Sequence, residues 1–168
     1  MSQKKYAPVQ SLMQKIAATP LGAWFYARTL HLSDGLFLRL SGGRMTISSL
    51  GTGLPVVIVT TTGAKSGLPR TIPLLCIRDE RDPANFALIA TNWGQKRYPA
   101  WYFNLKANPH ARGSLAGKTG EYLAHEAVAE EYARFWEYAA DMYVGYPLYK
   151  ERIRERSIPI MVMTPYKP

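Results

Sequence analysis

A loop rich in glycine, hydroxyl groups and cations lies between two predicted strands, at residues 60–70. Its backbone N–H groups, the Ser66 hydroxyl and the charges of Lys65 and Arg70 fall within a few residues of one another. Donors of this kind bind a phosphate or a carboxylate. The order of residues is not that of a Walker loop. A solvated hairpin turn fits the composition equally well.

Hydroxyl, aromatic and amide side chains follow at residues 91–109, beginning with Thr91. Trp93 and Trp101, with the amides of Asn92 and Asn104, suit the sandwiching of a flat heterocycle and the binding of its polar edge. Trp101 alternatively anchors the core, because most aromatic side chains serve packing. Both interpretations stay open at this point.

Three tyrosines recur at steps of three: Tyr143, Tyr146 and Tyr149, with Pro147 interrupting the helical pattern. If their hydroxyls converge, they can donate to a substrate oxygen that gains negative charge. A tyrosine with an ordinary pKa of about 10 keeps its proton at neutral pH. Packing of the three rings in a core is the alternative.

Other catalytic centres are disfavoured by the residue types. Cys76 is the only cysteine, so it forms neither an internal disulfide nor a thiolate metal site, and we expect it to be a small buried hydrophobe. His31, His110 and His125 lie in separate segments without metal-ligand spacing, so we expect structural or surface roles. No metal site is predicted.

The chain has 168 residues and a formal net charge of +9. This length favours one domain, and 47% hydrophobic residues suffice for a core. Nine of the 21 cationic residues but only one of the 12 acidic residues fall in residues 1–78. Most of the excess positive charge therefore lies in the first half of the chain. An uneven field of this kind attracts an anionic partner, which is a nucleic acid, a lipid surface or a phosphorylated small molecule.

The apolar pattern predicts short strands and a few helices. We expect strands at residues 44–49, 55–62, 70–78, 86–91, 112–115 and 121–127, which suggests a small barrel. We expect helices at 98–106 and at 129–144, the second ending at Gly145. No secretory signal and no membrane span is recognised, so a cytoplasmic setting is the default.

Residues 1–40 are expected to form an amphipathic helical segment. Thr19 should cap a second helix that begins at Pro20 and includes Trp24. We expect the apolar stripe of the first helix to pack within the protein. Contact with the inner face of the cell membrane is the alternative, because cations surround the stripe. The stripe consists of Val9, Leu12, Met13 and Ile16.

Three motifs together resemble the deazaflavin-dependent nitroreductase family of actinobacteria. They are TTGAKSGLPRTIPL at residues 61–74, PAWYFNLKANP at 99–109 and RSIPI at 156–160, and the three tyrosines stand at the family's spacing. The likeness covers roughly residues 40–165. Each motif alone is weak, but together they are specific.

The resemblance implies an α+β fold. We expect a single-domain split β-barrel, related to the FMN-binding split barrels, over residues 41–168, with an N-terminal helix and peripheral helices. Coenzyme F420, a deazaflavin, is the implied hydride donor. Lys65, Ser66 and Arg70 would hold its phosphate and glutamate tail. The implied cofactor-binding set is Lys65, Ser66, Gly67, Arg70, Pro73, Thr91, Asn92, Trp101 and Asn104.

The implied reaction is hydride transfer from reduced coenzyme F420 to a small hydrophobic acceptor, which is a quinone, an α,β-unsaturated ketone or a nitroaromatic compound. The implied catalytic residues are Tyr143, Tyr146 and Thr91, and Tyr149 and Trp24 join the two tyrosines in the substrate site. An FMN-binding split-barrel reductase and a non-catalytic coenzyme F420 carrier are the alternatives. Nucleic acid is not expected as a partner, because no recognition motif accompanies the charge.

Two positions differ from the pattern common in the family. Ala64 stands where relatives often have a basic residue, and Ile72 where they often have a polar one. The first difference concerns a contact to the coenzyme tail, and the second concerns a contact to its ring.

Overall fold

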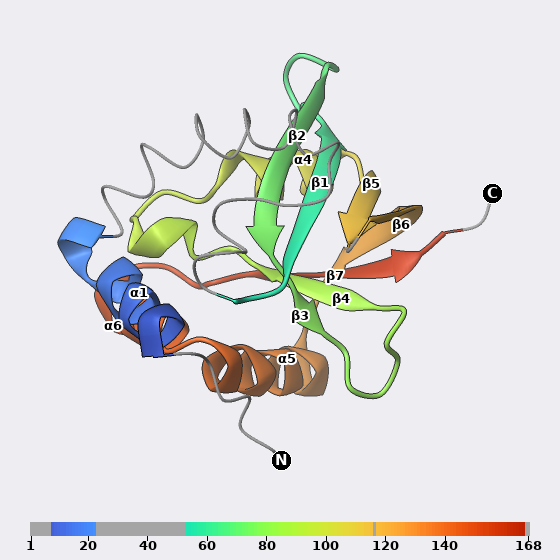
Figure 1. Ribbon diagram of the computed structural model, residues 1–168. Helices are drawn as coiled ribbons and strands as arrows, with labels where there is room; N and C mark the ends of the chain where they lie inside the picture. Colours follow the sequence, from blue (N-terminus) through green and yellow to red (C-terminus); the bar gives the residue numbers. More distant parts are fainter. Residues whose placement is uncertain (1–7, 23–52, 116, 167–168) are drawn as a thin grey trace.

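The computed structural model describes residues 8–22, 53–115 and 117–166, in which helices pack against one antiparallel sheet (Figure 1). The helices are α1 (Pro8–Ala18), α4 (Ala100–Ala107), α5 (Ala129–Met142), α6 (Gly145–Arg152) and the short 3₁₀ helix η1 (Asn92–Gly94). The strands are β1 (Val56–Thr62), β2 (Pro69–Leu75), β3 (Ile77–Arg78), β4 (Phe86–Ile89), β5 (His110–Leu115), β6 (Lys118–Glu126) and β7 (Ile160–Pro165).

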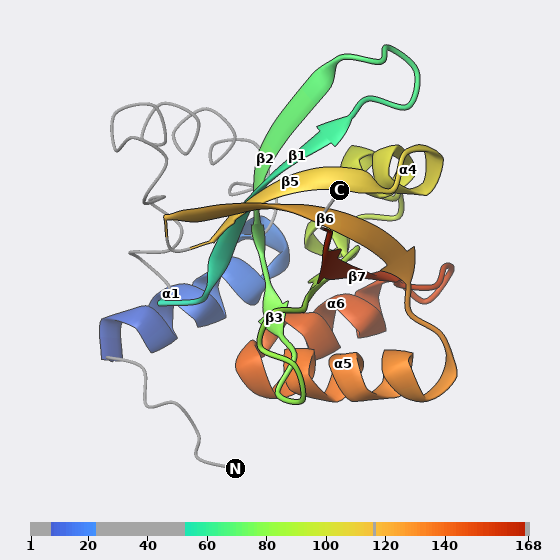
Figure 2. The same cartoon turned by 90° about the vertical axis from the view of Figure 1, so that its right-hand side faces the viewer.

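The two edge strands of the sheet are neighbours in sequence. The strand order is β2-β1-β5-β6-β7-β4-β3, yet only Cys76 separates β2 from β3. The sheet therefore curls until its two edges meet where β2 leads into β3 (Figure 2). At this point the Cys76 N–H donates to the Pro55 carbonyl at 3.0 Å. The curled antiparallel sheet confirms the predicted α+β split-barrel class.

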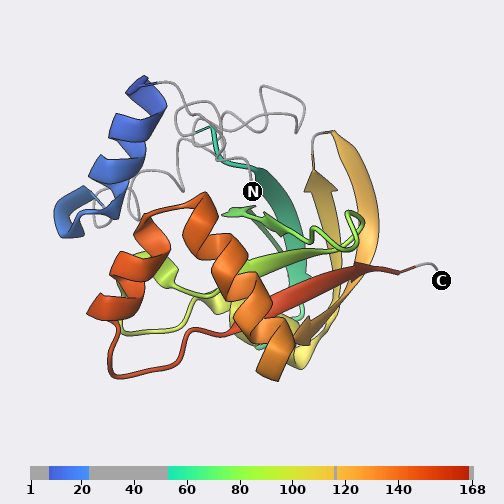
Figure 3. The same cartoon turned by 90° about the horizontal axis from the view of Figure 1, so that it is seen from below.

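Two hydrophobic cores lie on opposite faces of the curled sheet. Successive residues of a strand point to opposite faces, so β4 sends Phe86 and Leu88 into the core that contains Trp101 of α4, and Ala87 and Ile89 into the core beneath α5 and α6. Strand β7 alternates in the same way. Both strands are covered on both faces, which is why each is a nearly continuous apolar run (Figure 3).

The predicted strands at 55–62, 86–91, 112–115 and 121–127 correspond to β1, β4, β5 and β6, with shifted ends. The predicted strand at 70–78 is two strands, because the chain passes from one sheet edge to the other at Cys76. The sequence reading missed β7, which pairs with both β4 and β6. The predicted strand at 44–49 lies outside the described residues.

The segment with the three tyrosines differs from its prediction. Helix α5 ends at Met142, and a separate helix, α6, begins at Gly145. The interpretation of Pro147 as an interruption was wrong, since it lies in the first turn of α6. Proline is tolerated there because an N–H in the first turn has no partner within the helix.

The N-terminal helices keep the predicted cap but not the predicted packing. The Gly22 N–H donates to Thr19 Oγ1 at 3.0 Å, so the capping prediction is confirmed. The expected burial of the stripe was wrong, because Val9, Leu12 and Ile16 are 68%, 59% and 47% exposed. Helix α1 instead packs its other face on α6. The buried residues on that face are Gln14, Ala17 and Ala18. Trp24 lies outside the described residues.

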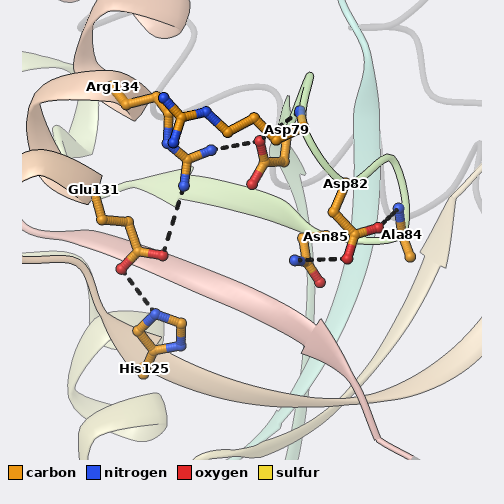
Figure 4. A network of polar contacts seen from close by, with 8 residues as sticks. Asp79, Asp82, Ala84, Asn85, His125, Glu131 and Arg134 are labelled. Atoms are coloured by element: carbon orange, nitrogen blue, oxygen red, sulfur yellow. Dashed lines mark hydrogen bonds and ion pairs between the residues drawn. The ribbon is translucent and has the colours of Figure 1, made fainter.

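A polar network fastens α5 to the β3–β4 hairpin (Figure 4). Arg134 of α5 donates to Asp79 in the turn after β3, and both side chains are largely buried. Glu131, one turn earlier, lies 3.9 Å from Arg134 and 2.9 Å from His125. Burial alone would raise the pKa of Asp79, but the hydrogen bond from Arg134 holds that pKa below its ordinary value.

In the described ranges, no helix is long and apolar enough to cross a membrane.

We predict that Arg134→Met destabilises the fold by about 3 kcal/mol at pH 7, because it leaves the Asp79 charge buried without a cation. The stabilisation is complete above the unfolded pKa of 3.8 and is lost as the pH falls through the lower folded pKa. The difference from wild type, measured by urea denaturation, should therefore shrink in acid.

Lys96→Met is the matched control for this prediction. It breaks an ion pair with Glu155 that is 2.9 Å long but 79% and 70% exposed, against 17% and 5% for Arg134 and Asp79. Exposed pairs contribute little to stability. A loss in Arg134→Met no greater than in this control would contradict the role of the network.

Candidate functional site

The loop between β1 and β2 is closed by its own hydrogen bonds. The Gly63 N–H donates to the Leu68 carbonyl at 2.9 Å, and the Gly67 N–H donates back to the Gly63 carbonyl at 2.8 Å. Gly67 has a φ of +66°, which a residue with a side chain rarely adopts. Ser66 Oγ accepts the Leu68 N–H at 3.3 Å. Gly67 thus shapes the loop, and its N–H is already used.

Asn104 of α4 lies beneath this loop and is buried. Its Oδ1 accepts the Ala64 N–H, and its Nδ2 donates to Thr61 Oγ1, both at 3.0 Å. The sequence reading gave Asn104 a place in the ring groove. The structure gives it partners within the protein that hold the loop on α4. Burial alternates along β1, and Thr61 lies on its buried side, but the residue types of this strand do not alternate and so gave no sign of the contact.

The loop keeps several donors that its own structure does not use. The N–H groups of Lys65 and Ser66 have no hydrogen-bond acceptor among the described residues. The exposed side chains of Lys65 and Arg70 form no ion pair in the described part of the chain. The strand register places Arg70 opposite Thr61, and Pro73 opposite Ile58 on the same hairpin. This end of the hairpin therefore offers an uncompensated positive charge to an anion.

The second predicted group begins where β4 ends. Asn92, Trp93 and Gly94 have φ values of 49°, 58° and 75°, three left-handed residues in succession. The Asn92 amide donates to the Arg97 carbonyl at 3.1 Å and so closes the loop on itself. Thr91 is buried and occupies the position before η1, yet its hydroxyl does not cap the helix and has no partner among the described residues.

Helix η1 packs directly against α6. A Cβ atom at Gly94 would lie 3.1 Å from Tyr149 Cδ1 and 3.0 Å from Arg152 Nη1, so only glycine fits without displacing its neighbours. This contact places the loop of Thr91 and Asn92 next to α6, which carries Tyr146 and Tyr149.

The three tyrosines are all buried, and two of their hydroxyls form a directed chain. Tyr149 donates to the Ala17 carbonyl of α1 at 3.1 Å, so its oxygen must accept from Tyr143, 3.2 Å away. The Tyr146 ring packs edge-on against Tyr143, but its hydroxyl has no hydrogen-bond partner within the described ranges.

Burial raises the pKa of the two tyrosines that follow Tyr143. The pKa of Tyr149 rises to about 12, and that of Tyr146 rises further because burial disfavours its charged form more strongly and because Tyr143 and Cys76 lie nearby. Both hydroxyls therefore stay protonated at physiological pH and act as donors.

The remaining candidates lie elsewhere. Trp101 is buried in the core inside the barrel, so its predicted contact with a coenzyme stays a prediction. Cys76 is buried, as expected, and burial raises its pKa to about 11. His110 and His125 are exposed, and His31 lies outside the described residues. Among the residues searched, no cluster of His, Cys, Asp and Glu is arranged to hold a metal ion.

The sequence profile of the F420H(2)-dependent quinone reductase family matches residues 36–165. The chain belongs to this family. An F420H(2)-dependent quinone reductase of Mycobacterium tuberculosis is 33% identical over 138 residues, which cover 80% of this chain and 89% of that protein. The predicted family, the hydride-transfer chemistry and the reduced coenzyme F420 as reductant are confirmed.

Solved structures agree with this assignment. An F420-H2 dependent reductase (FDR-A) matches 65% of this chain and 93% of its own, with a TM-score of 0.59 and 34% identity. A structure described as a domain-swapped dimer matches 77% of this chain and 94% of its own, with a TM-score of 0.61 and 31% identity. The heme storage protein HutZ of Vibrio cholerae, only 9% identical with a TM-score of 0.51, shares the fold.

Proposed function

We propose that the coenzyme and a quinone meet where the loop of Thr91 contacts α6. Two hydroxyls support this location, because Thr91 and Tyr146 are largely buried side chains whose hydroxyl groups have no partner among the described residues. Among the described residues, the fully buried side-chain polar atom without a partner is Asn85 Oδ1, so the hydroxyl oxygens of Thr91 and Tyr146 are not sealed off and can meet a bound molecule. The contact at Gly94 keeps the elements that carry the two groups together.

The β1–β2 loop fits the anionic end of coenzyme F420. The backbone N–H groups of Lys65 and Ser66 are available, and the charges of Lys65 and Arg70 are unpaired in the part of the chain that the structure describes. Phosphate and carboxylate groups bind to such a set of donors. In this arrangement Asn104 and Gly67 do not contact the anion. They stabilise the conformation of the β1–β2 loop that binds it.

Tyr146 is the tyrosine that we assign as proton donor. When bound, the reduced coenzyme supplies a hydride, which is one proton with two electrons, from C5 of its deazaflavin ring. A quinone that accepts this hydride still needs one proton on oxygen to become the neutral quinol. Tyr149 and Tyr143 already donate their protons along the chain to Ala17, which leaves the Tyr146 O–H free to donate. Solvent then restores that proton.

We predict that the protein quenches the fluorescence of coenzyme F420 on binding and oxidises its reduced form with menadione, while FMN binds far more weakly. Lys65→Gln should weaken coenzyme binding about tenfold, because it removes a charge-assisted contact to the anionic end. The matched control is Lys118→Gln, which alters an exposed lysine at the start of β6. Equal weakening in both variants would place the anion elsewhere, and absence of binding to wild type would refute the coenzyme site.

We predict that Tyr146→Phe lowers kcat with menadione about a hundredfold but leaves coenzyme affinity unchanged, as expected for loss of a general acid. Because burial raises the pKa of Tyr146, ionisation of this tyrosine should cause no fall in wild-type kcat up to about pH 10. Tyr132→Phe on the neighbouring α5 is the matched control. A kcat in Tyr146→Phe equal to that of the control would remove the assignment.

We further propose that α1 touches an anionic lipid surface. Its outward face carries Val9, Leu12 and Ile16, all exposed, with the cation of Lys15 beside them. The opposite face is fixed to α6, since Tyr149 and Arg152 donate to its last carbonyls at 3.1 Å and 3.0 Å. An apolar stripe with basic neighbours lies stably at a membrane surface.

We predict that the protein sediments with phosphatidylglycerol vesicles. The double variant with Leu12→Ser and Ile16→Ser should bind these vesicles with at least about tenfold lower affinity, because it removes apolar area from the lipid contact. Leu123→Ser, which alters an exposed leucine on β6, is the control. Unchanged vesicle binding would contradict the proposal, as would a concentration-dependent dimer that the double variant abolishes.

A further inference from the structure

Arg156 lies in the connection between α6 and β7, and its guanidinium donates to five backbone carbonyls. The bonds run from Nε to Gln95 (3.3 Å), from Nη1 to Ala90 (3.2 Å) and Ser157 (2.9 Å), and from Nη2 to Thr91 (3.1 Å), Gln95 (3.0 Å) and Arg97 (3.3 Å). Four of these carbonyls belong to residues 90–97, the loop that carries Thr91 and Asn92. One side chain therefore holds both ends and the middle of the loop.

The guanidinium is also fixed from a second side. Its central carbon lies 4.4 Å from the centre of the Tyr98 ring, and the Tyr98 hydroxyl lies 3.2 Å from Ser157 Oγ. Within the described residues no carboxylate lies within ion-pair distance of Arg156. The charge is therefore satisfied by carbonyl dipoles and by an aromatic face, and all of these except the Ser157 carbonyl belong to the segment that leads from β4 into α4.

The loop needs such support because its backbone is strained. Asn92 and Trp93 both have positive φ, which costs free energy for residues with a side chain. Few backbone hydrogen bonds form within the loop. The Gly94 N–H donates to the Thr91 carbonyl, and the Gln95 N–H donates to the Asn92 carbonyl, both at 3.0 Å. Without Arg156, the carbonyls of Ala90, Thr91, Gln95 and Arg97 would lose a donor together.

We propose that Arg156 is a positioning residue of the coenzyme site. Its planar fork holds residues 90–97 in the strained conformation that aims the unpartnered Thr91 hydroxyl, so it sets coenzyme affinity without touching the coenzyme. The proposal rests on the proposed function. Lysine cannot replace it, because an ammonium concentrates its donors on one atom and cannot reach carbonyls spread along a loop.

The test compares Arg156→Lys with wild type and with Arg154→Lys. Arg154 belongs to the same connection, but its guanidinium makes one bond, to the Glu151 carbonyl of its own helix turn. Hydrogen exchange of the Gly94 and Gln95 amides is measured without coenzyme, with the amides of β1 as an internal reference. Coenzyme F420 affinity is then measured by fluorescence quenching.

We expect Arg156→Lys to raise exchange at Gly94 and Gln95 at least about tenfold, to leave β1 unchanged and to weaken coenzyme binding about tenfold, since several charge-assisted bonds are lost. Arg154→Lys should behave as wild type. Unchanged exchange at the two amides would overturn the proposal, as would equal acceleration in β1, which indicates general destabilisation. Faster local exchange with unchanged coenzyme affinity would also overturn it.

Failure of the proposed function is a separate observation. If wild type does not bind the coenzyme, the coenzyme site itself is refuted, and with it the role of Arg156 in that site. The exchange measurement would then still show whether the guanidinium fixes the loop.

Discussion

The architecture depends on the single residue that joins the two edges of the sheet. With only Cys76 between β2 and β3, the strands at opposite ends of the sheet order must lie next to each other. A curled sheet has an inside that side chains fill and an outside that needs cover, so two cores form, one with α4 and one with α5 and α6. The loop after β4 leaves the sheet where these two cores meet, since Trp93 packs against one and Tyr98 against the other.

Polar groups near the candidate site divide into those that the fold uses and those that it leaves over. Asn104, Tyr143 and Tyr149 all have partners within the protein, and each connects two elements. Thr91 and Tyr146 are as deeply buried but have no such partner among the described residues. Neither hydroxyl oxygen is fully buried without a partner, as Asn85 Oδ1 is, so both hydroxyls remain available to a ligand, whereas the hydroxyls of Tyr143 and Tyr149 are already used within the protein.

The sequence predicted what depends on local residue chemistry. The Thr19 cap, the hairpin loop at 63–67 and the helix after residue 129 follow from neighbours in the chain, and the structure has them. Strand β7 was missed because burial on both faces removes the alternation that marks a strand. The role of Arg156 was missed because its acceptors lie about 60 residues away and are backbone carbonyls, which leave no pattern in side-chain types.

Helix α1 links the proposed lipid contact to the tyrosines. Its apolar residues face outward, while its last carbonyls accept from Tyr149 and Arg152 on the inner side. The bond to the Ala17 carbonyl fixes the direction of the hydroxyl chain, because it obliges Tyr149 to accept from Tyr143. While this bond holds, the protons of Tyr149 and Tyr143 are both used within the protein, and for that reason the proposed function takes its proton from Tyr146, which lies outside this chain of bonds.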